Sequence, residues 1–192
     1  MSDADVFIHE TAVVDEGAKI GGGSKIWHFC HVMGGAQVGS RVNMGQNVFV
    51  AATAIIGDGV KIQNNVSIYD GVILEEDVFL GPSCVFTNVS HPRSAVNRRG
   101  QYAQTLVCRG ATVGANATIV CGRTIGAFAF VAAGAVVTHD VAAHALVMGV
   151  PAEQRGWVCA CGETLRGEDV FACEGCGGRY VVSPSGTLES EG

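Results

Sequence analysis

A bulky apolar residue recurs at every sixth position over most of this chain, and this period constrains the fold more than any other feature. A period of six fits neither an α-helix nor an amphipathic strand. It fits a triangular prism in which each hexapeptide forms one short strand and one corner, and three hexapeptides close a coil of 18 residues. We therefore predict an all-β fold, a left-handed parallel β-helix of hexapeptide repeats over residues 6–150. The members are Ile8, Val14, Ile20, Ile26, Val32, Val38, Met44, Val50, Ile56, Ile62, Ile68, Leu74, Leu80 and Phe86, then Val107, Val113, Ile119, Ile125, Val131 and Val137.

Small residues accompany the apolar series on both sides. Small or β-branched residues dominate two positions before it, so Cys30 and Cys84 are expected to be core thiols. Glycine often follows the apolar residue, and we expect it to help the chain adopt positive φ at tight corners. These glycines are Gly21, Gly39, Gly45, Gly57, Gly81, Gly114 and Gly126.

Residues 18 apart should occupy the same corner on adjacent coils, about 4.8 Å apart. Asparagines stacked in this way can form purely structural ladders, since their amides pair and they tolerate left-handed backbone. Asn88 differs because it lies where the repeat breaks. The predicted columns are His28, Gln46 and Asn64; Phe29, Asn47, Asn65 and Ser83; and the pair Asp70 and Asn88.

The repeat is interrupted between Phe86 and Val107, which are 21 residues apart. Residues 87–106 must therefore leave the prism as a protruding loop. The loop carries Arg93, Arg98 and Arg99 in a chain with only 12 lysines and arginines. A guanidinium binds phosphate or carboxylate through two parallel hydrogen bonds, so the loop is a candidate anion-binding element. The alternatives are a solvated loop or ion pairs to a neighbouring subunit.

The chain carries a formal net charge of −6, which argues against nucleic-acid binding. The N-terminus lacks the apolar stretch of a signal peptide, and no apolar run approaches the roughly 20 residues that span a membrane. We expect a cytoplasmic protein without a membrane partner. The flat outer faces of a prism favour side-by-side association, and we predict a homotrimer with clefts between its subunits.

Four cysteines cluster after the repeat, in residues 151–182. Two knuckles, each followed by glycine, contain Cys159 and Cys161, then Cys173 and Cys176. Thiolates at this spacing can close a tetrahedral structural zinc site, so we predict a small zinc-ribbon-like appendage. Loose cysteines or disulfides are the alternatives, and the latter are disfavoured in the cytoplasm. The polar residues 183–192 are expected to be a disordered tail.

The chain also resembles a known enzyme family. The strings IHETAVVDEGAKIGGGSKIWHFCHV, MGQNVFVA, VKIQNNVSIYDGVILEEDVFLGPSCVFTNV, HPRSA, GATVGANATIVCG and ALVMGVPAEQRGWV resemble UDP-2-acetamido-3-amino-2,3-dideoxy-glucuronate N-acetyltransferases of bacterial surface-polysaccharide (O-antigen) synthesis. The resemblance covers about residues 6–158. His91 and Ala51 depart from the family pattern, and neither touches the central motif FTNV.

The resemblance implies acetyl-CoA as co-substrate and a nucleotide sugar with a pyrophosphate and a carboxylate. It places the Asn of FTNV, here Asn88, beside the sugar amine. We expect Asn88 to orient the amine, and Asp70 or His31 to accept its proton, unless the proton leaves with the CoA thiolate. Expected substrate-binding residues are Asn64, Tyr69, Arg93, Arg98 and His28.

For the cofactor we expect Ala132, Ala133 and Gly134, whose small side chains let the pantetheine arm approach the backbone, and Arg155 for a phosphate. Three other functions stay open. They are acetyl transfer to another nucleotide-linked amino sugar, a γ-type carbonic anhydrase that would use His139 and His144, and a non-catalytic scaffold.

Overall fold

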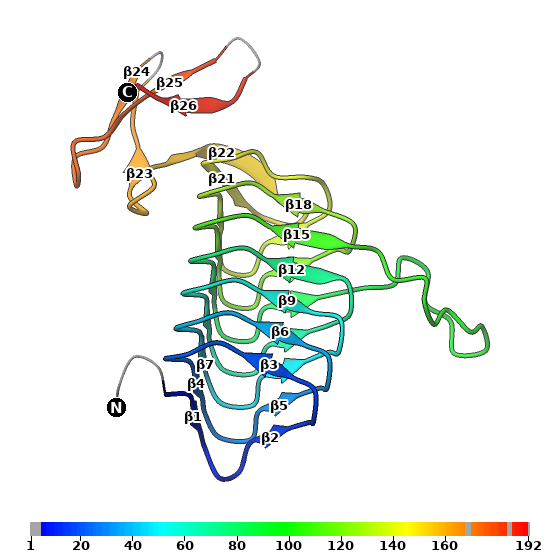
Figure 1. The fold of residues 1–192 in the computed structure, drawn as a ribbon. Coiled ribbons are helices and arrows are strands. Elements are labelled where there is room, and N and C mark those ends of the chain that lie inside the picture. The colour runs from blue at the N-terminus through cyan, green and yellow to red at the C-terminus, as the bar shows by residue number, and fades with distance from the viewer. Residues whose placement is uncertain (1–4, 168–169, 184–185, 192) are drawn as a thin grey trace.

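The computed structural model describes residues 5–167, 170–183 and 186–191. Most of them form a triangular prism of stacked coils, a left-handed parallel β-helix, as predicted (Figure 1). Each full coil contributes one short strand to each of three parallel sheets, here called sheets A, B and C. The part of the chain that the structure describes contains no helix long and apolar enough to cross a membrane.

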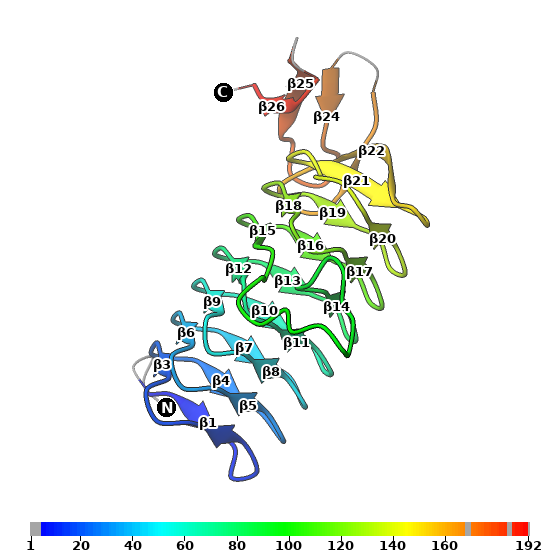
Figure 2. The same ribbon diagram turned by 90° about the vertical axis from the view of Figure 1, so that its right-hand side faces the viewer.

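The strands follow the repeat along the prism axis (Figure 2). Sheet A stacks β1 (Phe7–Ile8), β4 (Lys25–Ile26), β7 (Asn43–Met44), β10 (Lys61–Ile62), β13 (Phe79–Leu80), β16 (Thr112–Val113), β19 (Phe130–Val131) and β21 (Ala145–Met148). Sheet B stacks β2 (Val13–Val14), β5 (His31–Val32), β8 (Phe49–Val50), β11 (Ser67–Ile68), β14 (Val85–Phe86), β17 (Thr118–Ile119) and β20 (Val136–Val137). Sheet C stacks β3 (Lys19–Ile20), β6 (Gln37–Val38), β9 (Ile55–Ile56), β12 (Val72–Leu74), β15 (Thr105–Val107) and β18 (Thr124–Ile125).

The register confirms the 18-residue coil. Lys25 pairs with Asn43 and Ile26 with Met44, and the same offset of 18 recurs in all three sheets. The exceptions are the pairs that span the loop, such as Val72 with Thr105, and the last pair, β19 with β21. In the two-residue strands from β4 onward the second residue points inward, and the predicted series from Ile26 to Val137 forms one continuous buried core. Val14 and Ile20 are partly buried against this core, while Ile8 is 44% exposed at the end of the prism. Cys30 and Cys84 are each 1% exposed, so both thiols belong to that core as expected. Burial of these stacked aliphatic layers is the main stabilising contribution.

The glycines after the inward residues serve a different purpose from the one predicted. None of them has positive φ. A Cβ on Gly114 would lie 2.5 Å from the backbone N of Ala133, and one on Gly81 would lie 2.6 Å from the backbone N of Ala115. These glycines therefore allow close approach of the next coil. Positive φ is taken instead by residues further into the corners, such as Phe29, Asn47, Asn65, Ser83 and Asn116.

The loop leaves the fifth coil after β14 and returns at β15 (Figure 1). The prism continues across it without a change of register, since Val72 pairs with Thr105 and Leu74 with Val107. The loop therefore sits at the corner between sheets B and C.

The C-terminal segment closes one end of sheet A. β22 (Glu153–Val158) and β23 (Thr164–Leu165) extend that sheet in antiparallel fashion, and β24 (Val170–Ala172), β25 (Arg179–Val182) and β26 (Leu188–Ser190) form a separate three-stranded sheet. Trp157 packs against both the prism core and the small C-terminal core.

The prediction of a disordered tail is wrong for Leu188–Ser190, which form β26. Leu188 is only 4% exposed, and β26 pairs with β25, so burial of one apolar side chain and a strand edge orders this stretch. Residues 184–185 and 192 of the predicted tail lie outside the described residues.

Candidate functional site

Two of the three predicted columns, those that begin at His28 and Phe29, occur at the corner between sheets A and B. The backbone N–H of Gln46 donates to Oδ1 of Asn64 at 2.8 Å, and Nδ2 of Asn47 donates to Oδ1 of Asn65 at 3.0 Å. The His28 ring stacks on His9 with ring centroids 3.5 Å apart. The asparagine ladder is therefore structural, while His28 and Asn64 both line a shallow groove of about 320 Å³.

A second group lies on the outer face of sheet B. The His31 ring contacts Phe49 edge-on at 5.7 Å, and Phe49 lies 6.1 Å from Tyr69. Nε2 of His31 is 3.1 Å from Oδ2 of Asp15 on the preceding coil. A carboxylate in this position fixes the orientation of an imidazole ring. The sequence reasoning did not single out Asp15 or Phe49. The coil period places Phe49 next to His31, whereas Asp15 lies on a diagonal 16 residues back.

Asp70 occupies the B–C corner of the fourth coil. Its Oδ1 accepts hydrogen bonds from the hydroxyl of Thr53 at 2.7 Å and from the backbone N–H of Thr53 at 3.2 Å. Thr53 lies on the preceding coil, whereas Asn88 follows on the next one. The two hydrogen bonds thus hold one oxygen of Asp70 on the side away from Asn88.

Asn88 is half-buried at the base of the loop. Its carbonyl accepts the backbone N–H of Ala103 at 2.9 Å, which ties the two ends of the loop together. Beside it, Oγ1 of Thr87 accepts the backbone N–H of Cys121 at 2.9 Å. The Asn88 side chain therefore starts from a fixed backbone.

Two arginines of the loop, Arg93 and Arg98, line a hollow of about 340 Å³ together with Val89, Pro92, Ser94 and Val96. Nη1 of Arg98 donates to Oε1 of Gln101 at 3.2 Å, and Nη1 of Arg93 donates to its neighbour's carbonyl, that of Pro92, at 3.1 Å. Nε of Arg98 is buried without a hydrogen-bond partner among the described residues. Neither guanidinium has a carboxylate within 4.0 Å in the described chain, so both are available to an anion.

The residues expected for the cofactor lie in the seventh coil, at the A–B corner. Ala133 and Gly134 are exposed, and the N–H of Gly134, at φ 70°, donates to the carbonyl of Ala115 at 2.8 Å. Ala132 is half-buried and donates its N–H to Val147 at 2.9 Å. These three positions thus present only methyl groups and backbone to this corner.

Arg155, the residue expected to bind a phosphate, makes its side-chain contact away from that corner. It projects from β22, and its Nη2 is paired with Oε2 of Glu153 at 2.8 Å. The pair is exposed, so it is weak and a phosphate can compete for the guanidinium.

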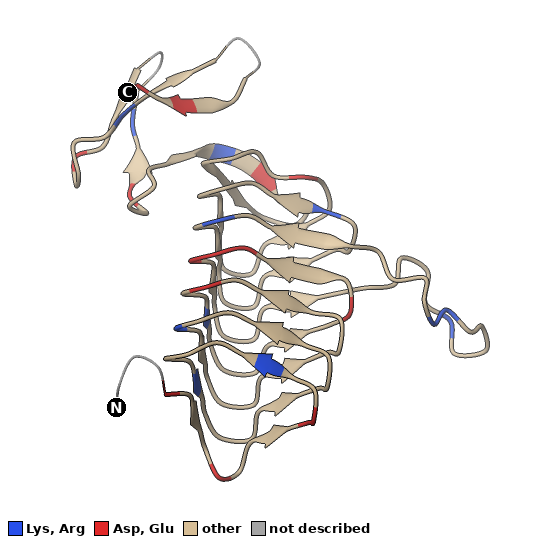
Figure 3. Ribbon diagram, in the orientation of Figure 1, with Lys and Arg blue, Asp and Glu red and all other residues tan. Residues whose placement is uncertain are grey.

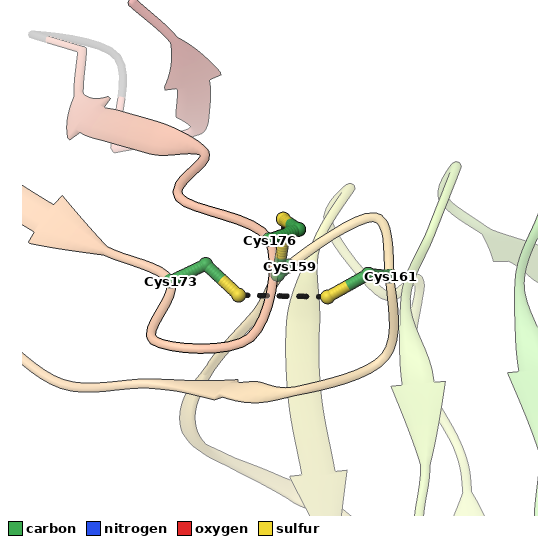
Figure 4. Close-up of side chains that lie close together, drawn as sticks. All are labelled: Cys159, Cys161, Cys173 and Cys176. Atoms are coloured by element: carbon green, nitrogen blue, oxygen red, sulfur yellow. Dashed lines mark hydrogen bonds between the residues drawn. The ribbon is translucent and has the colours of Figure 1, made fainter.

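The four C-terminal cysteines converge, as Figure 4 shows. Their Sγ atoms all lie within 4.8 Å of one another, with 3.4 Å between Cys159 and Cys176 and 3.5 Å between Cys161 and Cys173. The Tyr180 hydroxyl lies 3.1 Å from Sγ of Cys159. Burial raises the pKa of Cys159, but hydrogen bonds from the backbone of Cys161 and from Tyr180 outweigh it and lower this pKa to about 6. The set fits a tetrahedral thiolate site for Zn²⁺.

The histidines considered for a carbonic anhydrase have other partners. His144 is sandwiched between Phe128 and Tyr180, and its Nδ1 lies 2.9 Å from the carbonyl oxygen of Val158. His139 Nδ1 lies 2.9 Å from the Thr138 hydroxyl. Within the described residues, the four cysteines are the one cluster of three or more potential metal ligands.

Comparison with known proteins agrees with this geometry. Residues 17–52 and 53–88 match the family described as bacterial transferase hexapeptide (six repeats). The chain is 41% identical over 179 residues to a dTDP-3-amino-3,6-dideoxy-alpha-D-galactopyranose 3-N-acetyltransferase from Aneurinibacillus thermoaerophilus, covering 93% of this chain and 92% of that protein.

Two solved structures are similar. A mutant perosamine N-acetyltransferase from Caulobacter crescentus, in complex with CoA and GDP-perosamine, shares 25% identity with a TM-score of 0.50 over 80% of this chain, which spans 58% of that one. A hexapeptide-repeat-containing acetyltransferase from Vibrio cholerae, bound to acetyl coenzyme A, shares 28% identity with a TM-score of 0.53, covering 64% of this chain and 69% of that one.

The coil architecture and the near full-length similarity lead to one assignment. The chain belongs to the hexapeptide-repeat family of acetyltransferases, which are enzymes built on this left-handed prism.

Proposed function

We propose that the protein transfers the acetyl group of acetyl-CoA to the 3-amino group of a nucleotide-linked amino sugar. The observation that carries the proposal is the 41% identity to a 3-N-acetyltransferase of a nucleotide-linked 3-amino sugar, which extends over 93% of the chain. The product would then be a building block for bacterial surface polysaccharide, as the resemblance implies.

In the proposed reaction the neutral sugar amine attacks the thioester carbon, the C–S bond breaks, and CoA leaves as a thiol or thiolate. Positioning supplies much of the rate in such a reaction. Asn88, on its fixed backbone, would orient the amine through its side-chain amide. Backbone N–H groups of the prism would stabilise the developing oxyanion.

Two groups are candidates to accept the amine proton. His31 has the stronger geometric support, because Asp15 orients its ring at 3.1 Å. Asp70 has one oxygen occupied by Thr53, so its second oxygen would have to act. We therefore favour His31 as the base and Asp70 as a group that positions the substrate, together with Tyr69.

Acetyl-CoA would lie along the A–B corner of the late coils, with its pantetheine arm against Ala132, Ala133 and Gly134. The exposed and loosely paired Arg155 is placed to meet a phosphate of the cofactor. His28 and Asn64 lie at the same corner several coils away, on the side expected for the sugar nucleotide.

Two substrates have specific support. Arg93 and Arg98 have no carboxylate within 4.0 Å among the described residues, which favours a carboxylated sugar, UDP-2-acetamido-3-amino-glucuronate. The similarity to the Aneurinibacillus enzyme instead favours a neutral dTDP-3-amino-3,6-dideoxyhexose. The experiment measures kcat/KM for both with acetyl-CoA, confirming product by mass. A higher value for the uronate that falls selectively in Arg93→Ala and Arg98→Ala supports the carboxylate. A higher value for the dTDP sugar, unchanged in both variants, excludes it.

We further propose that the active enzyme is a homotrimer. The candidate groups of one chain divide between the A–B corner and the B–C corner, at opposite edges of sheet B. Apolar side chains also point outward from the prism, with Val13 56%, Val85 46% and Ile55 39% exposed. Packing of neighbouring prisms would cover these side chains and bring the loop of one subunit to the corner of another. Native mass spectrometry tests the trimer directly.

The last part of the proposal is a structural Zn²⁺ held by Cys159, Cys161, Cys173 and Cys176. All four ligands come from the protein, so the metal would have no open position for catalysis. The small C-terminal core needs such a crosslink, since a few buried side chains stabilise a short segment only weakly.

A further inference from the structure

A groove crosses the outer face of sheet A between the second and fourth coils. Two hollows of about 320 Å³ and about 410 Å³ adjoin there and share Trp27 and Asn43. The first hollow also presents the amides of Gln46, Gln63 and Asn64, and the second presents the cations of Lys25, Arg41 and Lys61. We call this surface the Trp27 groove. No carboxylate lines either hollow.

Trp27 is held in place at the centre of the groove. Its Nε1 donates to Oδ1 of Asn43 at 2.9 Å, and its ring packs against Phe7 with centroids 5.1 Å apart. The side chain is nevertheless 37% exposed. A fixed indole that remains partly open to solvent is a stacking surface for a flat ring such as a nucleobase.

The cations form one edge of the groove. Lys25 and Lys61 pair with Asn43 from either side in sheet A, which places their backbones about 10 Å apart at the strand spacing of β-sheets. Within the described residues neither lysine has a carboxylate within 4.0 Å, and Arg41 has only the exposed Asp58, at 3.9 Å. Figure 3 shows basic positions on the side of the prism where Figure 1 labels β4 and β7. In a chain of net charge −6, this local excess of positive charge attracts an anion.

From this arrangement we propose that the Trp27 groove binds the nucleoside diphosphate part of the sugar nucleotide. The base would lie against Trp27 with its polar edge toward the amides, and the phosphates would lie between Lys25, Arg41 and Lys61. The inference rests on the proposed function for the identity of the ligand, because it assigns the groove to that substrate and not to the cofactor.

The order of sites along the prism axis agrees with the assignment. The groove spans the second to fourth coils. Asn88 follows β14, the sheet B strand of the fifth coil, and the proposed cofactor corner belongs to the seventh coil. Sheet A is the side of the triangle opposite the B–C corner that carries Asn88. The loop of the same subunit therefore lies on the far side of the prism from the groove. In the proposed trimer, a loop that meets a nucleotide in this groove would come from a neighbouring subunit.

Binding can be read at Trp27 itself, because the chain has only two tryptophans. In a Trp157→Phe background of the full chain, UDP, dTDP, uridine, pyrophosphate and CoA are titrated while Trp27 fluorescence is recorded. We expect UDP or dTDP to quench it saturably, and the double variant Lys25→Ala/Lys61→Ala to weaken that binding by at least about tenfold. Lys19→Ala, a lysine on sheet C outside the groove, is the matched control and should leave the affinity unchanged.

Each alternative result overturns the inference in a recognisable way. Stronger quenching by CoA than by UDP or dTDP assigns the groove to the cofactor. Calorimetric binding of the nucleotides without a Trp27 response, or with unchanged affinity in the double lysine variant, places the nucleotide elsewhere. If that variant transfers acetyl groups with an unchanged KM for the sugar nucleotide, the proposed function stands but the groove is not the nucleotide site. Nucleotide binding at Trp27 without any acetyl transfer would support the groove as a nucleotide site and contradict the proposed function.

Discussion

Nε2 of His31 lies 3.1 Å from Oδ2 of Asp15, so a histidine of the second coil is oriented by a carboxylate of the first. The ring is also in contact with Phe49, and its side chain remains 44% exposed. If His31 is the base, His31→Gln should lower kcat by about 100-fold or more. Asp15→Asn should lower kcat less, because it removes the carboxylate that orients the ring but leaves the ring itself in place.

The measurement is steady-state transfer from acetyl-CoA across pH, with thermal unfolding as a check on the fold. Full activity in His31→Gln would show that the proton leaves by another route, through Asp70 or the departing thiolate.

Asn88→Ala tests the positioning of the amine. Because the backbone at Asn88 is fixed by the 2.9 Å hydrogen bond to Ala103, loss of the side chain should leave the loop in place and lower kcat by roughly 10–100-fold. Asn97→Ala, an exposed asparagine of the same loop, is the matched control. Equal kinetics for the two variants would remove Asn88 from the site.

Zinc removal should loosen the C-terminal segment while the prism stays folded. The four thiolates hold the two knuckles together, and the remaining core of this segment is small. We expect one equivalent of Zn²⁺ per chain by elemental analysis, and faster hydrogen exchange in β23–β25 after chelation. Cys161→Ser should reproduce that exchange pattern. Metal-free protein with the same protection would show that the cysteines are not a zinc site.

Gly114→Ala should destabilise the prism, because the added Cβ would lie 2.5 Å from the backbone N of Ala133. Overpacking of this kind costs about 1–3 kcal/mol in the free energy of unfolding. Gly156→Ala is the control, since nothing lies within 4 Å of its Cβ position and its φ is not positive. Denaturant unfolding of both variants measures the difference, and equal stabilities would contradict the close approach of the coils.

The buried thiol of Cys84 predicts a pH dependence of stability. Burial raises its pKa from 9.0 to about 12. Between these values the unfolded chain loses a proton that the folded chain keeps, so the free energy of unfolding falls as pH rises, by at most about 1.4 kcal/mol per pH unit. Between pH 8 and pH 10.5 the wild type should therefore lose more stability than Cys84→Ala. Parallel losses would show that Cys84 ionises freely in the fold.

The architecture could be predicted from the sequence because one period fixes both the strand positions and the register. The inward series from Ile8 to Val137 and the neighbours in each column, such as Gln46 and Asn64, follow from counting by 6 and 18. The convergence of the four cysteines follows from their spacing.

Contacts that depend on side-chain direction could not be predicted in the same way. The sequence puts Asp70 in register with Asn88, but it does not show that Thr53 holds the Asp70 carboxylate on the other side. The pairing of His31 with Asp15 joins residues 16 apart, a diagonal that a strict count of 18 passes over. The order around Leu188 depends on a partner strand that no local pattern reveals.

The uninterrupted pairing of β12 with β15 has an evolutionary consequence. Val72 pairs with Thr105 in the register of an ordinary coil, so the pairing of the coils does not depend on how many residues protrude between Phe86 and Thr105. Insertions, deletions and wholesale exchange at this point leave the stack of coils intact. If the loop contacts the sugar, as proposed, relatives with the same scaffold can change the sugar they accept by altering this one segment, without a change of fold.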